Sequence, residues 1–153
     1  MDNNSIYAEV LGLIDLTSLN PTDTPSSIRA MVGKVNSFKD DFPSYNLPAS
    51  ICVFPNFAGL VRSELKSSDV HVTVVGGCFP ASQSPLEVKI LECDKAVKDG
   101  ADEVDIVLAL NSFLDGRYDD AANEIKSIRS AVDECRSGIT LKVILETGAL
   151  KER

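Results

Sequence analysis

The sequence lacks most of the features from which a metal site, a disulfide framework or a membrane segment could be built. It holds one histidine, His71, so a histidine-rich zinc site is not available. Its four cysteines form no C-x-x-C pair, which indicates reduced thiols. The longest apolar runs, Val72–Phe79 and Val104–Leu110, are far too short to cross a bilayer. We therefore expect neither a metal nor a membrane as a partner.

Basic residues are in the minority, and this narrows the range of partners further. The chain has 23 acidic and 15 basic residues, for a formal net charge of −8 at pH 7. Nucleic acids and anionic membranes would repel such a surface. An anionic small substrate remains compatible with it, because a few local lysines can hold one phosphate. Met1–Asn4 lacks the basic and apolar regions of a signal peptide, so we expect a cytoplasmic protein.

Common nucleotide-binding and hydrolase motifs are also missing. Gly76-Gly77 does not continue into a G-x-G-x-x-G frame, and no Walker lysine motif is present. The G-x-S-x-G motif of the α/β-hydrolases is absent as well. None of these motifs therefore indicates a cofactor or a serine nucleophile.

What the sequence does contain is an alternation of short β-branched runs with longer segments of helical period. The expected strands are Val10–Leu16, Ser50–Phe54, His71–Val75, Glu103–Leu108 and Ile139–Leu145. Strand–helix–strand units of this kind require parallel strands. The chain is thus expected to form an α/β fold.

Local signals mark where the intervening helices begin. Thr24-Pro25 is typical of an N-cap followed by proline at the first helical position. Ser84–Glu87 has capping-box spacing, and Asn56 is a candidate cap for the helix between them. After Gly116, apolar residues recur at helical spacing on one expected face: Tyr118, Ala121, Ile125, Ile128 and Val132.

Two architectures fit five strands separated by four helices. One is an open, doubly wound, flavodoxin-like sheet, and the other is a (β/α)8 barrel truncated after its fifth strand. Pattern alone favours the open sheet, because it is complete at 153 residues. In either case we expect residues 1–153 to form a single domain.

Four polar residues interrupt strands that should otherwise be continuously apolar. They are Asp15, Cys52, Asp105 and Lys142. An unpaired buried charge costs several kcal/mol in effective terms, so the acids and the lysine must meet one another. In a barrel, inward residues near the carboxyl ends of the strands converge on one pocket. A desolvated carboxylate beside a lysine there would suit proton transfer.

Each of these residues also has a structural explanation when taken alone. Asp105 could be a paired or edge carboxylate, Cys52 a small core residue, and Lys142 a side chain extending from an edge strand. Asp102-Glu103 reads as a solvated turn, and His71 as a surface residue without a partner. Three charged groups inside apolar strands nevertheless favour a functional pocket.

These residues lie in segments that resemble the signature segments of one enzyme family, the deoxyribose-phosphate aldolases. Four such segments occur in the family's order and span nearly the whole chain: Leu13–Asn20, Ile51–Pro55, Gly100–Val107 and Leu141–Gly148. The resemblance implies a class I Schiff-base aldolase on a (β/α)8 barrel, a lyase of deoxyribonucleotide catabolism. It would cleave 2-deoxyribose 5-phosphate reversibly to glyceraldehyde 3-phosphate and acetaldehyde, with no metal or organic cofactor.

The resemblance also implies roles for individual residues. Asp105 would be the catalytic carboxylate that donates and accepts protons together with a lysine. Asp15 would order substrate hydroxyls and pocket water, and Lys142 would lie in the polar cluster beside the nucleophile. Three further residues would line the substrate pocket: Thr17, Cys52 and Phe79.

The family's Schiff-base lysine lies on the sixth strand, a second catalytic lysine on the seventh, and the phosphate-binding backbone in the last two units. The 153 residues contain none of these units. We therefore expect the N-terminal part of a longer aldolase, inactive by itself, whose open barrel edge promotes self-association or homo-oligomer formation. Two alternatives stay open: a five-stranded binding or regulatory module, and a Schiff-base barrel aldolase for another sugar phosphate.

Overall fold

The computed structural model describes residues 3–151 and contains one five-stranded parallel sheet. The strands are β1 (Asp15–Thr17), β2 (Ser50–Val53), β3 (His71–Gly76), β4 (Glu103–Val107) and β5 (Thr140–Ile144). The longer helices are α1 (Asn3–Leu11), α2 (Pro25–Asp41), α3 (Ala58–Glu64), α4 (Leu86–Lys98) and α6 (Tyr118–Cys135). Three short helical elements complete the chain: η1 (Pro55–Phe57), α5 (Leu110–Leu114) and α7 (Thr147–Leu150).

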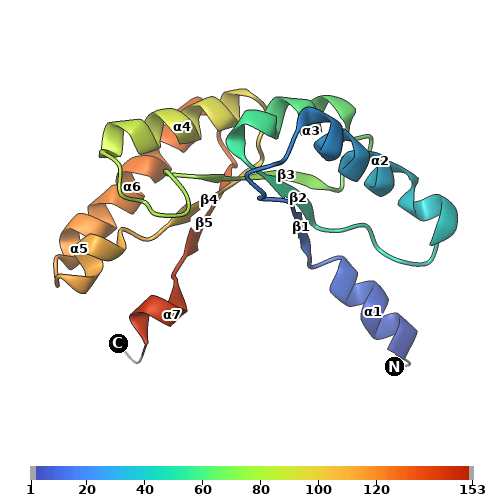
Figure 1. The fold of residues 1–153 in the computed structure, drawn as a ribbon, viewed down its shortest axis with the longest axis horizontal. Coiled ribbons are helices and arrows are strands. Elements are labelled where there is room, and N and C mark those ends of the chain that lie inside the picture. Colours follow the sequence, from blue (N-terminus) through green and yellow to red (C-terminus); the bar gives the residue numbers. More distant parts are fainter. Residues whose placement is uncertain (1–2, 152–153) are drawn as a thin grey trace.

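The order of the strands decides between the two expected architectures. The strands follow one another in chain order, β1-β2-β3-β4-β5, and every pair is parallel. Helices α2, α3, α4 and α6 form one arched layer on one side of the sheet (Figure 1). A doubly wound sheet reverses its strand order and carries helices on both faces. The observed winding is instead that of consecutive units of a (β/α)8 barrel, so the open-sheet alternative is wrong.

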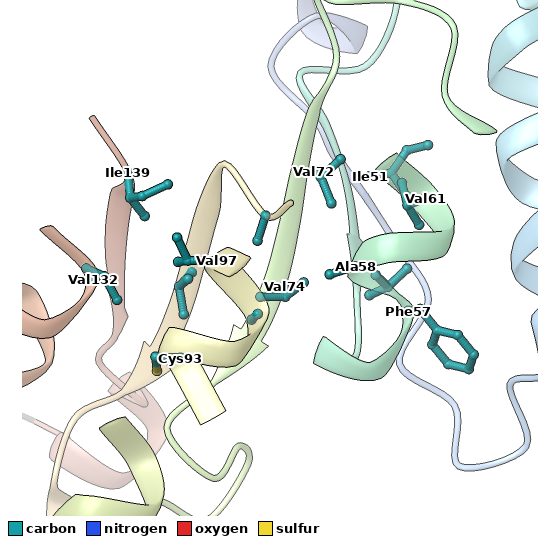
Figure 2. Packing of buried hydrophobic residues seen from close by; sticks show 14 of the residues in the cluster. Ile51, Phe57, Ala58, Val61, Val72, Val74, Cys93, Val97, Val132 and Ile139 are labelled. Atoms are coloured by element: carbon teal, nitrogen blue, oxygen red, sulfur yellow. The ribbon is translucent and has the colours of Figure 1, made fainter. Parts of the chain in front are cut away.

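Alternation along the strands divides their side chains between two faces. One face packs against the helices: Ile51, Val72, Val74, Val104 and Ile106 are all buried in the main core. Figure 2 shows strand residues of this core with helix residues such as Val61, Cys93, Val97 and Val132. The opposite face of the sheet carries the polar residues that interrupt the apolar strands.

Helix starts follow the sequence signals in one of three places. Thr24 caps α2: its Oγ1 accepts a hydrogen bond from Ser27 N at 3.2 Å, and Ser27 Oγ accepts one from Thr24 N at 2.9 Å. The capping box expected at Ser84–Glu87 is wrong, since α4 begins at Leu86 after Pro85 with no side-chain cap. Asn56 lies inside η1 and does not cap α3.

The first expected strand, Val10–Leu16, is wrong over its first five residues. Val10 and Leu11 end α1, and three successive turn hydrogen bonds connect Gly12, Leu13 and Ile14 to the helix end. Sheet pairing begins only at Asp15, opposite Ser50. The other four strands match their expected ranges to within one residue at each end.

Two further corrections concern the segment before α6. The short helix α5 was not expected, and Tyr118 does not point into the core. Tyr118 is instead exposed and packs edge-on against Phe113, with ring centroids 5.0 Å apart. Ala121, Ile128 and Val132 of the expected face are buried. No helix within residues 3–151 is long and apolar enough to span a membrane.

Candidate active site

The sheet face turned away from the helices gathers the polar residues of the strands. Residues paired across neighbouring strands share a face, and the register aligns Asp15 with Ser50, Thr73 with Glu103, and Asp105 with Lys142. We call this surface the inner face, because it corresponds to the interior of a closed barrel. Asp105 and Lys142 are the central residues of their strands, whereas Asp15 and Glu103 are the first residues of theirs. The charged groups therefore lie at the middle and the amino ends of the strands, and not near the carboxyl ends as expected.

Lys142 is the centre of the inner-face charges. Its Nζ lies 2.8 Å from Asp15 Oδ2, 2.8 Å from Glu103 Oε2 and 3.2 Å from Asp105 Oδ1. These residues come from β1, β4 and β5, so the lysine side chain connects the two edge strands of the sheet. We call Asp15, Glu103, Asp105 and Lys142 the charged cluster.

Neutral and aromatic polar groups hold two of the three carboxylates in place. Ser50 Oγ donates to Asp15 Oδ1 at 2.7 Å, and Thr73 Oγ1 donates to Glu103 Oε2 at 2.9 Å. His71 Nδ1 lies 2.6 Å from Glu103 Oε1. Burial would raise the pKa of Glu103, but its hydrogen bonds with His71, Lys142 and Thr73 outweigh burial and lower this pKa below its usual range. Glu103 is therefore a carboxylate at neutral pH.

Asp105 has a different environment from the other two acids. Its side chain is 16% exposed, and its Oδ1 is a buried atom without a hydrogen-bond partner among the described residues. Burial raises the pKa of Asp105, and the charges of Asp15 and Glu103 act in the same direction. Lys142 opposes the shift without cancelling it. Asp105 thus accepts a proton more readily than an aspartate in water does.

Lys142 shows the opposite behaviour. Burial would lower the pKa of its ammonium, but hydrogen bonds to Asp15 and Glu103 and the charge of Asp105 raise it above its usual range. Lys142 therefore stays protonated at neutral pH. Nucleophilic attack on a carbonyl requires a neutral amine, so an ammonium held in this way is a poor nucleophile and a source of positive charge for the surrounding carboxylates.

Cys52 and Thr17 are partners in the register between β1 and β2. Cys52 is buried, and burial together with the nearby Asp105 raises the pKa of its thiol to about 11. Thr17 is exposed, and its Oγ1 donates to the carbonyl of Asp15 at 2.9 Å. Both residues lie on the inner face beside the charged cluster, and the thiol is held in its neutral form.

Phe79 lies apart from the strands, in the connection between β3 and α4. It is half-buried and follows the last residue of β3, Gly76, by three positions. Its position in the substrate pocket stays a prediction.

Glu103 is the member of the charged cluster that the sequence reasoning missed. Asp102-Glu103 was expected to be a solvated turn, and this is wrong for both residues. Glu103 is part of the charged cluster, and Asp102 accepts a hydrogen bond from Val72 N at 2.9 Å and pairs with Arg62. The alternation of side chains along a strand could have revealed this, because Glu103 is two residues before Asp105 and therefore lies on the same face of the sheet. His71 is half-exposed, as expected for a surface residue, but it has a partner in Glu103.

Candidate metal ligands do not assemble elsewhere in the structure. Residues 3–151 contain no group of three or more histidine, cysteine, aspartate or glutamate side chains placed to hold a metal ion. Within the cluster, the Lys142 ammonium occupies the position between the three carboxylates. All four cysteines are free thiols.

Sequence comparison finds relatives that carry one name. A deoxyribose-phosphate aldolase of Metamycoplasma hominis is 39% identical over 137 residues, which is 90% of this chain and 57% of the relative. A deoxyribose-phosphate aldolase of Treponema denticola is 37% identical over 140 residues, covering 92% of this chain and 60% of the relative. The chain therefore spans less than two thirds of the length of these relatives. No family model matches the chain.

Solved structures give the same result for the fold. The tetrameric deoxyribose-phosphate aldolase of Aeropyrum pernix superposes with a TM-score of 0.70 at 26% identity, over 92% of this chain and 54% of that one. An aldolase named QR15 superposes with a TM-score of 0.75 at 30% identity, over 91% of this chain and 56% of that one. In sequence and in fold, this chain therefore corresponds to the N-terminal portion of deoxyribose-phosphate aldolases.

Proposed function

We propose that this chain supplies the first five units of a class I aldolase barrel that reversibly cleaves 2-deoxyribose 5-phosphate to glyceraldehyde 3-phosphate and acetaldehyde. The observation that carries the proposal is the charged cluster, in which one protonated lysine lies within 3.2 Å of three carboxylates. The similarity to named deoxyribose-phosphate aldolases over 90% of the chain supports the substrate class.

Asp105 is the proposed proton donor and acceptor. A retro-aldol cleavage removes a proton from a hydroxyl group and returns one to carbon, so it needs a group that can exist in both protonation states near neutral pH. The raised pKa of Asp105, which follows from its burial, moves this carboxyl group towards that range. Its carboxyl group lies 3.2 Å from the Lys142 ammonium, which stabilises the carboxylate once its proton has been passed on.

Lys142 is proposed to act electrostatically and not as the nucleophile. Its amine is held protonated by the cluster, so imine formation requires a second, neutral lysine. Within residues 3–151, Lys142 is the only strand lysine that the register places on the inner face. We therefore expect the 153-residue chain to be inactive by itself.

The other inner-face residues are proposed to shape the pocket. Asp15, which accepts from Ser50, is placed to order substrate hydroxyls and water. Thr17, Cys52 and Phe79 are proposed to line the space around the substrate. The neutral thiol of Cys52 suits an apolar contact and not a nucleophilic role, because its pKa is raised to about 11.

The proposal extends to partners and location. The substrate is a small phosphorylated sugar, with neither nucleic acid nor membrane as a partner, and no cofactor is needed. A related aldolase is described as tetrameric, which supports a homo-oligomer here. A cytoplasmic location fits four free thiols, because the cytosol keeps cysteines reduced. A sugar phosphate other than 2-deoxyribose 5-phosphate is the second candidate, since the charged cluster recognises no particular sugar.

The test is release of acetaldehyde from 2-deoxyribose 5-phosphate by the protein in its natural length, compared with Asp105→Asn. General acid–base catalysis contributes about 10²- to 10⁴-fold, so the variant should lose that much of kcat. Asp115→Asn is a matched control, because Asp115 is exposed and pairs only with Arg117 among the described residues. Full activity of Asp105→Asn, or turnover by the 153-residue chain alone, would contradict the proposal.

A further inference from the structure

A buried lysine outside the charged cluster ties the connection between β3 and α4 to two helices. Lys89 of α4 is only 2% exposed, and it is the largest by volume of the fully buried side chains among the described residues. Its Nζ donates to the carbonyl of Ser82 at 2.7 Å, to Ser82 Oγ at 2.9 Å, and to Glu124 Oε1 of α6 at 2.7 Å. Every proton of the ammonium thus has an acceptor.

The segment that Lys89 holds is closed and locally strained. Ser82 N donates to the Cys78 carbonyl at 3.0 Å, which closes a turn around Phe79. Cys78 and Ser82 have φ angles of 62° and 51°, in the left-handed region that residues other than glycine rarely adopt. Conformations of this kind persist only where the surroundings impose them.

Charged side chains of α4 contact both strained residues. Glu92 Oε2 accepts a hydrogen bond from Cys78 N at 2.6 Å, and Lys89 binds Ser82 through both of its oxygen atoms. The two contacts hold the beginning and the end of the turn. The side chain between them that the proposed function assigns to the substrate pocket is Phe79.

Burial of a lysine is costly, and this points to a role beyond stability. A buried ion pair is often no more stabilising than well-packed apolar residues, whereas it does require one geometry. We infer that Lys89 is a positioning residue: it fixes the conformation of residues 78–82 and thereby places Phe79 at the carboxyl end of β3. The connection to substrate rests on the proposed function, but the anchoring of the turn does not.

The experiment is hydrogen–deuterium exchange of the 153-residue chain, read peptide by peptide, for wild type and three variants. Lys89→Met removes all three contacts, and Lys89→Met with Glu124→Gln also removes the carboxylate that would be left unpaired. Lys95→Met is the matched control, because Lys95 lies on the same helix and its exposed side chain pairs only with Asp99 among the described residues.

Both Lys89 variants should speed exchange in residues 78–82 by about tenfold or more, the effect expected from losing hydrogen bonds to a charged group. Exchange in β3 and β4, and the melting temperature of the double variant, should stay close to wild type. Unchanged exchange in the turn would overturn the inference. So would a uniform increase across the chain with a lower melting temperature, because Lys89 would then only support the core.

A second readout separates positioning from the proposed function. In natural-length protein that turns over 2-deoxyribose 5-phosphate, the double variant should raise KM more than it lowers kcat, because Phe79 contacts substrate and not the reacting bond. An unchanged KM would overturn the role of Lys89 toward substrate. Absence of turnover in wild-type protein would contradict the proposed function, while the exchange result would still decide whether Lys89 anchors the turn.

Discussion

Oδ1 of Asp105 lies 3.2 Å from Nζ of Lys142, and the two residues are partners in the register of β4 and β5. The carboxylate is nevertheless not satisfied, because Oδ1 has no hydrogen-bond partner among the described residues and Lys142 makes closer contacts with Asp15 and Glu103. Burial of the Asp105 side chain, together with the charges of Asp15 and Glu103, outweighs the effect of Lys142, so the pKa of Asp105 rises where a simple ion pair would lower it.

The first prediction concerns stability and pH. Burial raises the pKa of Asp105 above its usual value of 3.8, so the folded protein binds this proton more tightly than the unfolded chain does. Ionisation of Asp105 therefore destabilises the fold. Relative to Asp105→Asn, wild-type protein should lose unfolding free energy as the pH rises from 3.8 through the raised pKa. Urea denaturation of both proteins across this range measures the difference, and parallel pH curves would contradict the expectation.

The second prediction concerns Lys142. Lys142→Met leaves three carboxylates close together without a cation, which should lower the unfolding free energy by about 2 kcal/mol. This decrease is smaller than the one expected when a fully buried ion-pair partner is removed, because the Lys142 side chain is 34% exposed. The loss should shrink at acidic pH as the carboxylates become protonated. Lys34→Met on α2, an exposed site, is the control and should change stability by no more than about 0.5 kcal/mol. An equal loss in both variants would exclude the cluster as the cause.

The third prediction concerns association of the chain. β1 and β5 each have one unpaired edge in the described sheet, and Leu13 beside β1 is 81% exposed. Unpaired edges and exposed apolar residues promote association. Size-exclusion chromatography with light scattering should therefore show dimers or larger species. Leu13→Lys should shift them toward monomer, whereas Leu91→Lys on the exposed surface of α4 should not. A monomer at every concentration would contradict the prediction.

The fourth prediction concerns the cysteines. Burial raises the pKa of Cys52 to about 11 and that of Cys93 to about 12, so few of these thiols are ionised. Only the thiolate reacts quickly with a disulfide reagent. Titration with such a reagent in native buffer should label Cys78 and Cys135, which are partly exposed, well before the other two. Cys52→Ser should leave the rate and extent of this early labelling unchanged. Fast labelling of Cys52 would contradict its burial.

Much of the sheet could be predicted from the sequence, because short β-branched runs bounded by turn residues report strands directly. Asp105 and Lys142 were recognisable as strand residues for the same reason: a charge inside an apolar run needs an explanation. Their contact was a further step, since it depends on the register of β4 and β5. The barrel winding was not accessible from periodicity, which at this length favours an open sheet, and came only from family resemblance.

What the sequence did not reveal depends on distant contacts. Glu103 was interpreted as a turn residue because Asp102 precedes it, and only the three-dimensional pairing with Lys142 places it in the charged cluster. Lys89 falls on the buried face of α4, but its partner Glu124 lies on another helix. The helical end at Val10–Leu11 was mistaken for a strand because its apolar residues continue into β1, and helix and strand compete for such short runs.

The most direct test of the account is the intact mass of the protein after borohydride reduction in the presence of acetaldehyde. Borohydride traps an imine as a stable amine, so a reactive lysine gains the mass of one reduced adduct. The account predicts no adduct on the 153-residue chain, because Lys142 is held protonated by three carboxylates, and one adduct on the natural-length protein at a different lysine. An adduct mapped to Lys142 in the 153-residue chain would contradict the account and make this residue the nucleophile.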